Sequence, residues 1–120
     1  MFSYENLEVY KKAYNTNLIV YRLLKKNKNI EFYARNQFSR ACLSIVLNIA
    51  EGSAKYSDKD RKNFFIIARG SAFECSSLIC LLYEEGEIDQ ASKEKLYNSF
   101  EEISKILYVM IRNLESHDKK

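Results

Sequence analysis

The chain contains no proline and only three glycines, Gly52, Gly70 and Gly86, in its 120 residues. An all-β fold needs a turn about every 8 to 12 residues, and proline and glycine supply many of those turns. This scarcity of turn residues therefore excludes an all-β fold and favours a chain that is helical throughout. At this length a single domain is expected.

Apolar residues that recur at steps of three and four predict four helices. We expect them over about 7–26, 32–51, 57–85 and 90–115, with Ser57 capping the third helix and Gly86 ending it. Gly52 stands where a left-handed residue would end the second helix. Short connections favour antiparallel neighbours, so the sequence predicts an all-α, up-down-up-down four-helix bundle over 1–115 and a frayed tail over 116–120.

Each predicted helix carries one apolar stripe that we expect to face the core. The stripes are Leu7, Tyr10, Tyr14, Asn17, Tyr21 and Leu24; Phe38, Cys42, Ile45 and Ile49; Phe65, Ala68, Ala72, Cys75, Ile79 and Leu82; and Leu96, Phe100, Ile103, Leu107, Met110 and Leu114. The helical spacing of Tyr10, Tyr14 and Tyr21 favours packing over a ligand-binding role.

The second and third helices have more apolar residues than one covered stripe requires. Ala41 to Ala50 is apolar around almost its whole circumference, and the third helix has a second seam, which consists of Phe64, Ile67, Leu78 and Leu81. A helix in a monomeric bundle needs only one covered face. We therefore expect a homo-oligomer, in which Gly70, Ser71 and Ala72 let another helix approach closely. A broad core in a monomer is the alternative.

Charge and cysteine content limit the class of protein. Residues 1–70 carry 13 Lys and Arg against 6 Asp and Glu, whereas residues 71–120 carry 6 against 10. Such a split fits a nucleic-acid-facing half or the mutual packing of basic and acidic helices. Three cysteines without C-x-x-C spacing fit a reducing compartment, and no signal peptide or bilayer-length apolar run is evident. We therefore expect a cytoplasmic protein with no membrane partner.

Residues typical of one known family are spread over the second and third predicted helices. The most specific string is Asn48-Ile49-Ala50-Glu51-Gly52. The others are Gln37, Arg40, Ala41, Ser44, Ile45, Ser57-Asp58-Lys59, Phe64-Phe65, Ile67-Ala68, Gly70-Ser71 and Glu74, preceded by Phe2, Leu7-Glu8-Val9-Tyr10 and Ala13. On these residues the chain resembles the four-helix-bundle family of 23S ribosomal RNA intervening-sequence proteins.

The resemblance implies a left-handed four-helix bundle that assembles as a homopentamer, with no established enzyme activity. Two positions depart from the family pattern: Ser39 replaces an arginine, which weakens a nucleic-acid role, and Val46 replaces a proline, which removes a kink. A more remote resemblance is to the accessory protein of diversity-generating retroelements, a basic pentamer that works with a reverse transcriptase.

Catalytic chemistry has little support in the sequence. Di-iron bundles need two Glu-x-x-His pairs, and the chain has one histidine, so we predict no metal and no cofactor. Glu51 and Glu74 adjoin apolar seams and are candidates for inward-facing carboxylates. We expect such a carboxylate to accept hydrogen bonds from helix ends or from neighbouring Ser, Asn and Arg groups, for example Asn48 or Ser71. We favour this over metal or acid–base chemistry, because a buried carboxylate is costly without partners.

Arg112 and His117 have the R-x-x-x-x-H spacing of the higher eukaryote and prokaryote nucleotide-binding ribonucleases. In that chemistry, His117 acts as general acid or base while Arg112 stabilises phosphate charge. The spacing also arises by chance, and the pair lies near the end of the chain. A metal-independent ribonuclease is therefore a remote alternative.

Basic residues around the family motif are the candidate nucleic-acid-binding site. They are Arg35, Arg40, Lys55, Lys59, Arg61, Lys62 and Arg69. Repeated around an oligomer, such a patch forms a basic ring that follows phosphates without reading sequence. Tyr33 and Tyr56 lie nearby and can stack on bases. The alternative is an ordinary solvated surface.

We thus predict a non-enzymatic homo-oligomer, a pentamer by resemblance, with structured RNA or DNA as a partner. The second hypothesis is a protein–protein adaptor that uses the surplus apolar faces and the acidic fourth helix. Asn48, Glu51, Gly52, Gly70, Ser71 and Glu74 are expected to be structural residues of the family motif.

Overall fold

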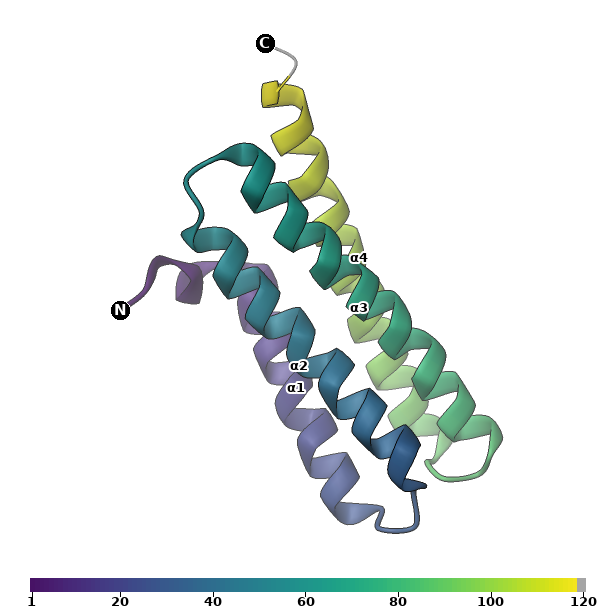
Figure 1. The fold of residues 1–120 in the computed structure, drawn as a ribbon. Helices are drawn as coiled ribbons and strands as arrows, with labels where there is room; N and C mark the ends of the chain where they lie inside the picture. The colour runs from purple at the N-terminus through teal and green to yellow at the C-terminus, as the bar shows by residue number, and fades with distance from the viewer. Residues whose placement is uncertain (119–120) are drawn as a thin grey trace.

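The structure is a computed structural model that describes residues 1–118, with side chains described through residue 116. Its elements are a short 3-10 helix η1 (Ser3–Asn6) and four α-helices: α1 (Glu8–Lys26), α2 (Phe32–Ala54), α3 (Asp58–Glu84) and α4 (Gln90–Asp118). Successive helices run in opposite directions (Figure 1). The predicted all-α four-helix bundle is confirmed, and α4 extends into the segment predicted as a tail, whose last two residues lie outside the described ones.

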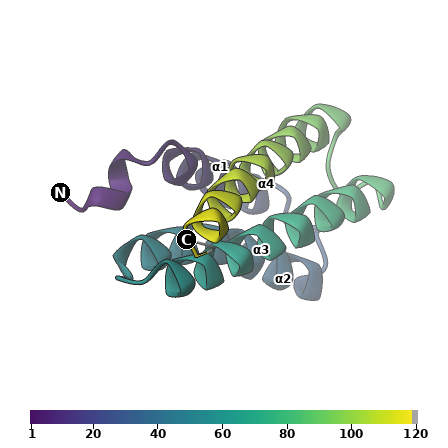
Figure 2. The same ribbon diagram turned by 90° about the horizontal axis from the view of Figure 1, so that it is seen from above.

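Helices that follow one another in sequence pack side by side. α3 packs most extensively, against α2 and α4, and α4 closes the bundle by packing against α1. Viewed from above, α1 lies beside α4, and α2 lies beside α3 (Figure 2). The bundle measures 51 × 28 × 22 Å, so its two ends are far apart and a site at one end cannot include residues of the other.

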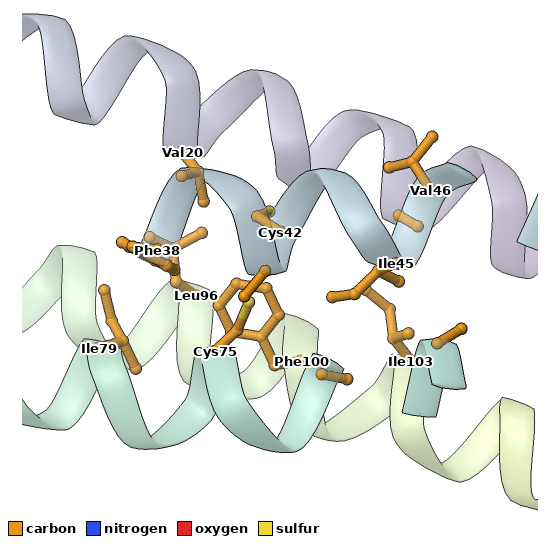
Figure 3. Packing of buried hydrophobic residues seen from close by; sticks show 14 of the residues in the cluster. Val20, Phe38, Cys42, Ile45, Val46, Cys75, Ile79, Leu96, Phe100 and Ile103 are labelled. Carbon is orange, nitrogen blue, oxygen red and sulfur yellow. The ribbon is translucent and has the colours of Figure 1, made fainter. Parts of the chain in front are cut away.

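The predicted core stripes of α2 and α3 are confirmed. All ten of their residues are buried. Leu96, Phe100 and Ile103 of α4 meet them across the bundle (Figure 3), and Leu107 belongs to the same buried cluster. The rings of Phe38 and Phe100 pack edge to face with centroids 6.1 Å apart. Further along α4, Ile111 is buried while the predicted Met110 and Leu114 are only partly buried.

The predicted stripe of α1 is wrong by about one residue. Its buried residues are Val9, Ala13, Thr16, Val20 and Leu24. Tyr14 and Tyr21 are 48% and 59% exposed, and Tyr10 is half-buried. Small and β-branched side chains let α1 approach the bundle, whereas tyrosine hydroxyls keep access to water at its edge. Thr16 is tolerated inside because its hydroxyl donates to the Lys12 carbonyl at 2.8 Å.

Two of the displaced tyrosines, Tyr10 and Tyr14, form part of an aromatic row at the surface of η1 and α1. The ring of Tyr4 packs edge to face on Tyr10 with centroids 4.7 Å apart, and the Tyr10 and Tyr14 centroids are 6.0 Å apart. Burial of the Tyr10 hydroxyl and the nearby tyrosines raise the pKa of Tyr10. The row therefore holds η1 against the start of α1 through ring contacts outside the core.

The prediction that Gly52 ends α2 in a left-handed conformation is also wrong. α2 continues to Ala54, and Gly52 is buried inside it. A Cβ atom at Gly52 would lie 2.8 Å from the ring of Phe65, so a glycine is required by close packing with α3. Gly86 is the glycine in the left-handed conformation, with a φ of +72°. It follows the end of α3, as predicted. Ser57 caps α3 as predicted, because its hydroxyl accepts from the Asp60 amide at 3.1 Å.

Candidate nucleic-acid interface

Four of the seven predicted basic residues gather at the connection between α2 and α3. Lys59 is exposed there, and the ammonium of Lys55 lies 5.0 Å from the Phe64 ring centroid. Arg61 donates from Nε to the Lys55 carbonyl at 2.7 Å and lies 3.8 Å from Asp58. Arg61 therefore braces the connection, while the Lys55, Lys59 and Lys62 ammonium groups supply its positive charge.

Arg35 lies at the opposite end of the bundle and has a structural contact. Its guanidinium donates to the carbonyl oxygens of Leu24 and of Asn27, the latter at 2.6 Å. These carbonyls belong to the end of α1, where the last backbone acceptors have no partner within the helix. Arg35 thus ties the start of α2 to the end of α1, and these backbone contacts occupy its guanidinium.

The two remaining arginines lie along the bundle. Arg40 is exposed on α2, where its Nε is 3.4 Å from the side-chain oxygen of Asn36. Arg69 is half-buried between α3 and α4, and its Nε donates to the Ser104 carbonyl at 3.3 Å. The fold therefore brings Lys55, Lys59, Arg61 and Lys62 together and leaves Arg35, Arg40 and Arg69 apart from them.

A row of polar side chains follows the outer side of the α2–α3 contact. Gln37 donates to the Glu74 carboxylate, the Ser44 and Ser71 hydroxyls are 2.9 Å apart, and Asn48 donates to the Ser44 carbonyl and hydroxyl at 2.8 and 3.0 Å. We call these five side chains the polar row. They align the two helices above the apolar core.

Glu51 and Glu74 are exposed and do not face the core, contrary to the first of the two expectations for them. Their charged oxygens stay in water because burying a carboxylate without partners is costly. Glu74 has its hydrogen bond with Gln37, whereas Ser71 pairs with Ser44. Of the motif residues, Ser71 and Glu74 therefore join α3 to α2 along one outer seam, and Asn48 supports Ser44 there.

The outer faces of α2 and α3 also carry uncovered apolar side chains. Leu47, Ile67 and Leu81 are 55%, 51% and 58% exposed. We call these three residues the apolar face. Phe64 and Leu78, the other members of the predicted second seam, are half-buried. The surplus predicted from sequence is real, since two of the four seam residues, Ile67 and Leu81, remain more than half exposed in the protomer.

Gly70 opens outward beside this face. A Cβ atom built there has no atom of the described residues within 4 Å, so none of them requires a glycine at this position. The other two small residues of the predicted trio do not share this role, because Ala72 is in the core and Ser71 belongs to the polar row. Helical geometry rotates successive residues by about 100°, which separates the three.

α3 also meets the length and mean hydropathy of a membrane span, 1.6 over an 18-residue window, although polar residues interrupt its apolar runs. Only 33% of that window is buried inside the bundle. Six of its side chains fill the core, which is the arrangement of a core helix in a bundle. We attribute the remaining hydropathy to the uncovered outer side of α3.

The sequence profile described as 23S rRNA-intervening sequence protein matches residues 5–109. The chain belongs to this family. A crystal structure of a protein of unknown function from the S23 ribosomal protein family, from Bacteroides thetaiotaomicron, has a TM-score of 0.80 to it. The two are 28% identical over 86% of this chain and 97% of that one. No curated protein matches the chain.

The region that matches the intervening-sequence family contains the polar row, Gly52, Gly70 and the basic connection, but it ends before Arg112 and His117. The proposed ribonuclease pair therefore gains nothing from family membership. Arg112 is exposed on α4, and the side chain of His117 lies outside the described ones. Among the described residues, no three His, Cys, Asp or Glu side chains gather as metal ligands would.

The cysteines of this family member are free thiols, and two of them meet in the core. Cys42 and Cys75 are buried and Cys80 is half-buried. A hydrogen bond with Cys42 and burial raise the pKa of the Cys75 thiol. A raised pKa keeps the Cys75 thiol protonated and makes it a poor nucleophile. Both cysteines are buried and pack as small apolar side chains, as predicted.

One cluster in the structure was not predicted. The guanidinium of Arg69 lies over two rings, 4.7 Å from the Phe73 centroid and 5.3 Å from that of Tyr108. Arg69 and Phe73 are four residues apart and therefore share a helix face. That spacing was visible in the sequence, but the contribution of Tyr108 from α4 depends on the register of the two helices.

Proposed function

We propose that this family member is a non-enzymatic homo-oligomer, a pentamer as its family resemblance implies, that binds structured RNA in the cytoplasm without a membrane partner. The carrying observation is that the apolar face and the basic α2–α3 connection lie on the same pair of helices. Assembly through the apolar face would repeat the basic connection around the symmetry axis of the oligomer. Neither feature is needed to fold a protomer whose core is already filled.

Self-association is supported by the exposure of the apolar face and by the open space beside Gly70. Three large apolar side chains about half exposed on adjoining helices form the kind of surface that marks a contact with another protein. A glycine inside a long helix costs about 1 kcal/mol relative to alanine. Because no described residue of the protomer approaches Gly70, we infer that close packing of a neighbouring subunit explains the glycine at this position.

RNA binding is supported by the position of the lysines. Lys55 lies in the connection and Lys59 is exposed in the first turn of α3, so their ammonium groups can reach phosphates. Contacts of this kind follow the backbone without reading bases and weaken steeply as salt rises. Arg35 is not part of this surface, since backbone carbonyls occupy it.

Light-scattering mass tests the assembly. We expect a mass of several protomers for the wild type and a shift toward the 14.1 kDa protomer for Ile67→Asp. Val109→Asp is the matched control, because Val109 is 56% exposed on α4 and outside the apolar face. A monomeric wild type would contradict the proposed assembly. Equal masses for Ile67→Asp and Val109→Asp would show that the subunit contact is not at the apolar face of α3.

Binding to a short RNA hairpin, followed by fluorescence anisotropy at increasing salt, tests the ligand. We expect Lys55→Gln with Lys59→Gln to weaken binding and to reduce the salt slope by about two. Lys105→Gln should change little, since that ammonium is on α4, 3.8 Å from Glu101. An oligomer that ignores the hairpin at low salt would favour the adaptor hypothesis, in which the apolar face binds a different protein.

A further inference from the structure

The outer groove between α3 and α4 carries an arrangement that the core does not use, and its larger hollow adjoins the proposed oligomer contact at Gly70. Two adjoining hollows meet at Phe73. The larger, of about 410 Å³, lies between Arg69, Tyr108 and Arg112, and the smaller lies beside Tyr97. Phe73, Tyr108 and Tyr97 are 53%, 49% and 38% exposed. We call this surface the aromatic groove.

Arg69 is held in a fixed position in the groove. Its guanidinium lies between the Phe73 and Tyr108 rings, and its Nε donates to the Ser104 carbonyl. These contacts restrict a side chain that would otherwise lose much rotamer freedom when it bound a ligand. About half of each ring nevertheless stays open to solvent. The groove is therefore preorganised and accessible at once.

The groove also contains positive charge without an internal partner. Among the described residues, no carboxylate forms an ion pair with Arg69 or Arg112, although Glu115 lines the same hollow. Glu101, in the smaller hollow, is paired with Lys105. Two unpaired guanidinium groups beside open aromatic rings suit a ligand that combines flat rings with negative charge.

We propose that the aromatic groove binds an unpaired stretch of RNA, whose bases stack on Tyr108, Phe73 and Tyr97 while its phosphates contact Arg69 and Arg112. Paired bases are enclosed in the helix and cannot reach these rings, so a duplex would use the arginines alone. Tyr97 and Tyr108 are eleven residues apart on α4, about 16 Å along its axis. The groove thus offers stacking surfaces in series and not a single pocket.

This inference rests on the proposed RNA binding and specifies that the ligand includes a single-stranded segment next to a structured one. The lysines at the α2–α3 connection would contact the backbone of either form. The rings of the groove would distinguish the two forms. Lys62 lies at the start of α3, seven residues before Arg69 and hence on the same side of the helix, which links the two surfaces.

The test compares two fluorescein-labelled probes, the 16-nucleotide RNA (CA)8, which cannot pair with itself, and the duplex it forms with (UG)8. We expect Phe73→Ala and Tyr108→Ala each to weaken (CA)8 binding about tenfold, within the range measured for loss of one base stack, and to change duplex binding less than about twofold. Tyr108→Phe keeps the ring and should bind as the wild type does. Arg69→Gln should weaken (CA)8 binding as well.

Tyr21→Ala is the matched control, because Tyr21 is an exposed α1 ring with the ammonium of Lys25 4.5 Å from its centroid. The inference is overturned if Tyr21→Ala and Tyr108→Ala have equal effects, or if Tyr108→Ala weakens both probes alike. A wild type that binds the duplex but not (CA)8 rejects the groove and retains the proposed function. Binding to neither probe rejects both. Unchanged melting temperatures would show that the variants are folded.

Discussion

Gly52 and Gly70 both lie inside long helices of the same helix pair, but their surroundings are opposite. A Cβ atom at Gly52 would lie 2.8 Å from the Phe65 ring, whereas one at Gly70 would meet nothing within 4 Å. The first glycine is required by the protomer, because Phe64 and Phe65 of α3 occupy the space that a side chain would need. Gly70 is not required by the described residues of the protomer, so we infer that a contact with another molecule explains a glycine in this helix.

The same contrast extends along the whole α2–α3 contact. Its inner side is closed by large apolar side chains and by the paired thiols of Cys42 and Cys75. Its outer side is the polar row, flanked by the apolar face and Gly70. The inner side accounts for the stability of the bundle. The outer side fixes the alignment of the helices and leaves a surface for something else.

The largest effect is expected for Gly52→Ala. The added methyl group must displace Phe65 or separate the helices, and overpacking of this kind costs about 1–3 kcal/mol. Urea unfolding should therefore show a lower midpoint with an unchanged slope.

The identity of the contact can be tested with Phe65→Leu, which removes the ring that the methyl group would meet. In that background Gly52→Ala should be less destabilising than in the wild type, as a double-mutant cycle would measure. Equal costs in both backgrounds would mean that the Phe65 ring does not oppose the methyl group, and would point instead to Phe64, whose Cβ would lie 3.0 Å away.

Much of the inner side could be predicted from the sequence, because α2, α3 and α4 place large apolar residues at helical spacing. The α1 stripe was missed since tyrosines outweigh Ala13 and Thr16 in any count of apolar residues, although the smaller side chains face the core. Gly52 was misassigned because a glycine near a helix end looks the same whether it ends the helix or packs against a neighbour.

The site was less predictable than the fold. Arg35 looked like a phosphate ligand, but it contacts the end of α1 eleven residues away. The Arg69 cluster requires Tyr108, which is 39 positions further along the chain. Contacts of this kind depend on how two helices are offset, and helical periodicity carries no information about that offset.

A smaller effect is expected in the polar row. Ser71→Ala removes one hydrogen bond and should lower the free energy of unfolding by about 1 kcal/mol. Ser44→Ala should cost more, because the Ser44 hydroxyl also accepts from Asn48. Denaturant unfolding of the single and double variants should show that the two losses are not additive.

Ser99→Ala serves as the comparison for these variants. The Ser99 hydroxyl donates only to the Lys95 carbonyl of its own helix, at 3.1 Å, so its loss should change stability by less than about 0.5 kcal/mol. If Ser71→Ala were as harmless as Ser99→Ala, the polar row would not align the helices.

Gly70→Ala is expected to have the opposite sign to Gly52→Ala. In the protomer, alanine should stabilise α3 by up to about 1 kcal/mol, because it favours the helix and meets no neighbour. In an assembly that needs close approach at this point, the same methyl group should raise the dissociation constant. Thermal unfolding of dilute protein and light scattering of concentrated protein measure the two effects separately. If Gly70→Ala were more stable and assembled as the wild type does, Gly70 would not be part of the subunit contact.

The smallest effect concerns the thiols of the inner side. The pKa of Cys75 is raised in the folded state by the Cys42 hydrogen bond and by burial, whereas in the unfolded state the thiol titrates near its ordinary pKa of about 8.5. The unfolded state therefore releases this proton first as pH rises, so the Cys75 contribution is complete below pH 8.5 and declines above it. At pH 8.5 the decline should be about 0.4 kcal/mol, measured as the difference between wild type and Cys75→Ala over the same pH range.

Alkylation offers an independent measure of how the thiols are buried, because half-buried Cys80 should react before Cys42 and Cys75. Equal reaction rates for all three cysteines in the folded protein would show that the buried Cys42 and Cys75 thiols are as accessible as that of half-buried Cys80.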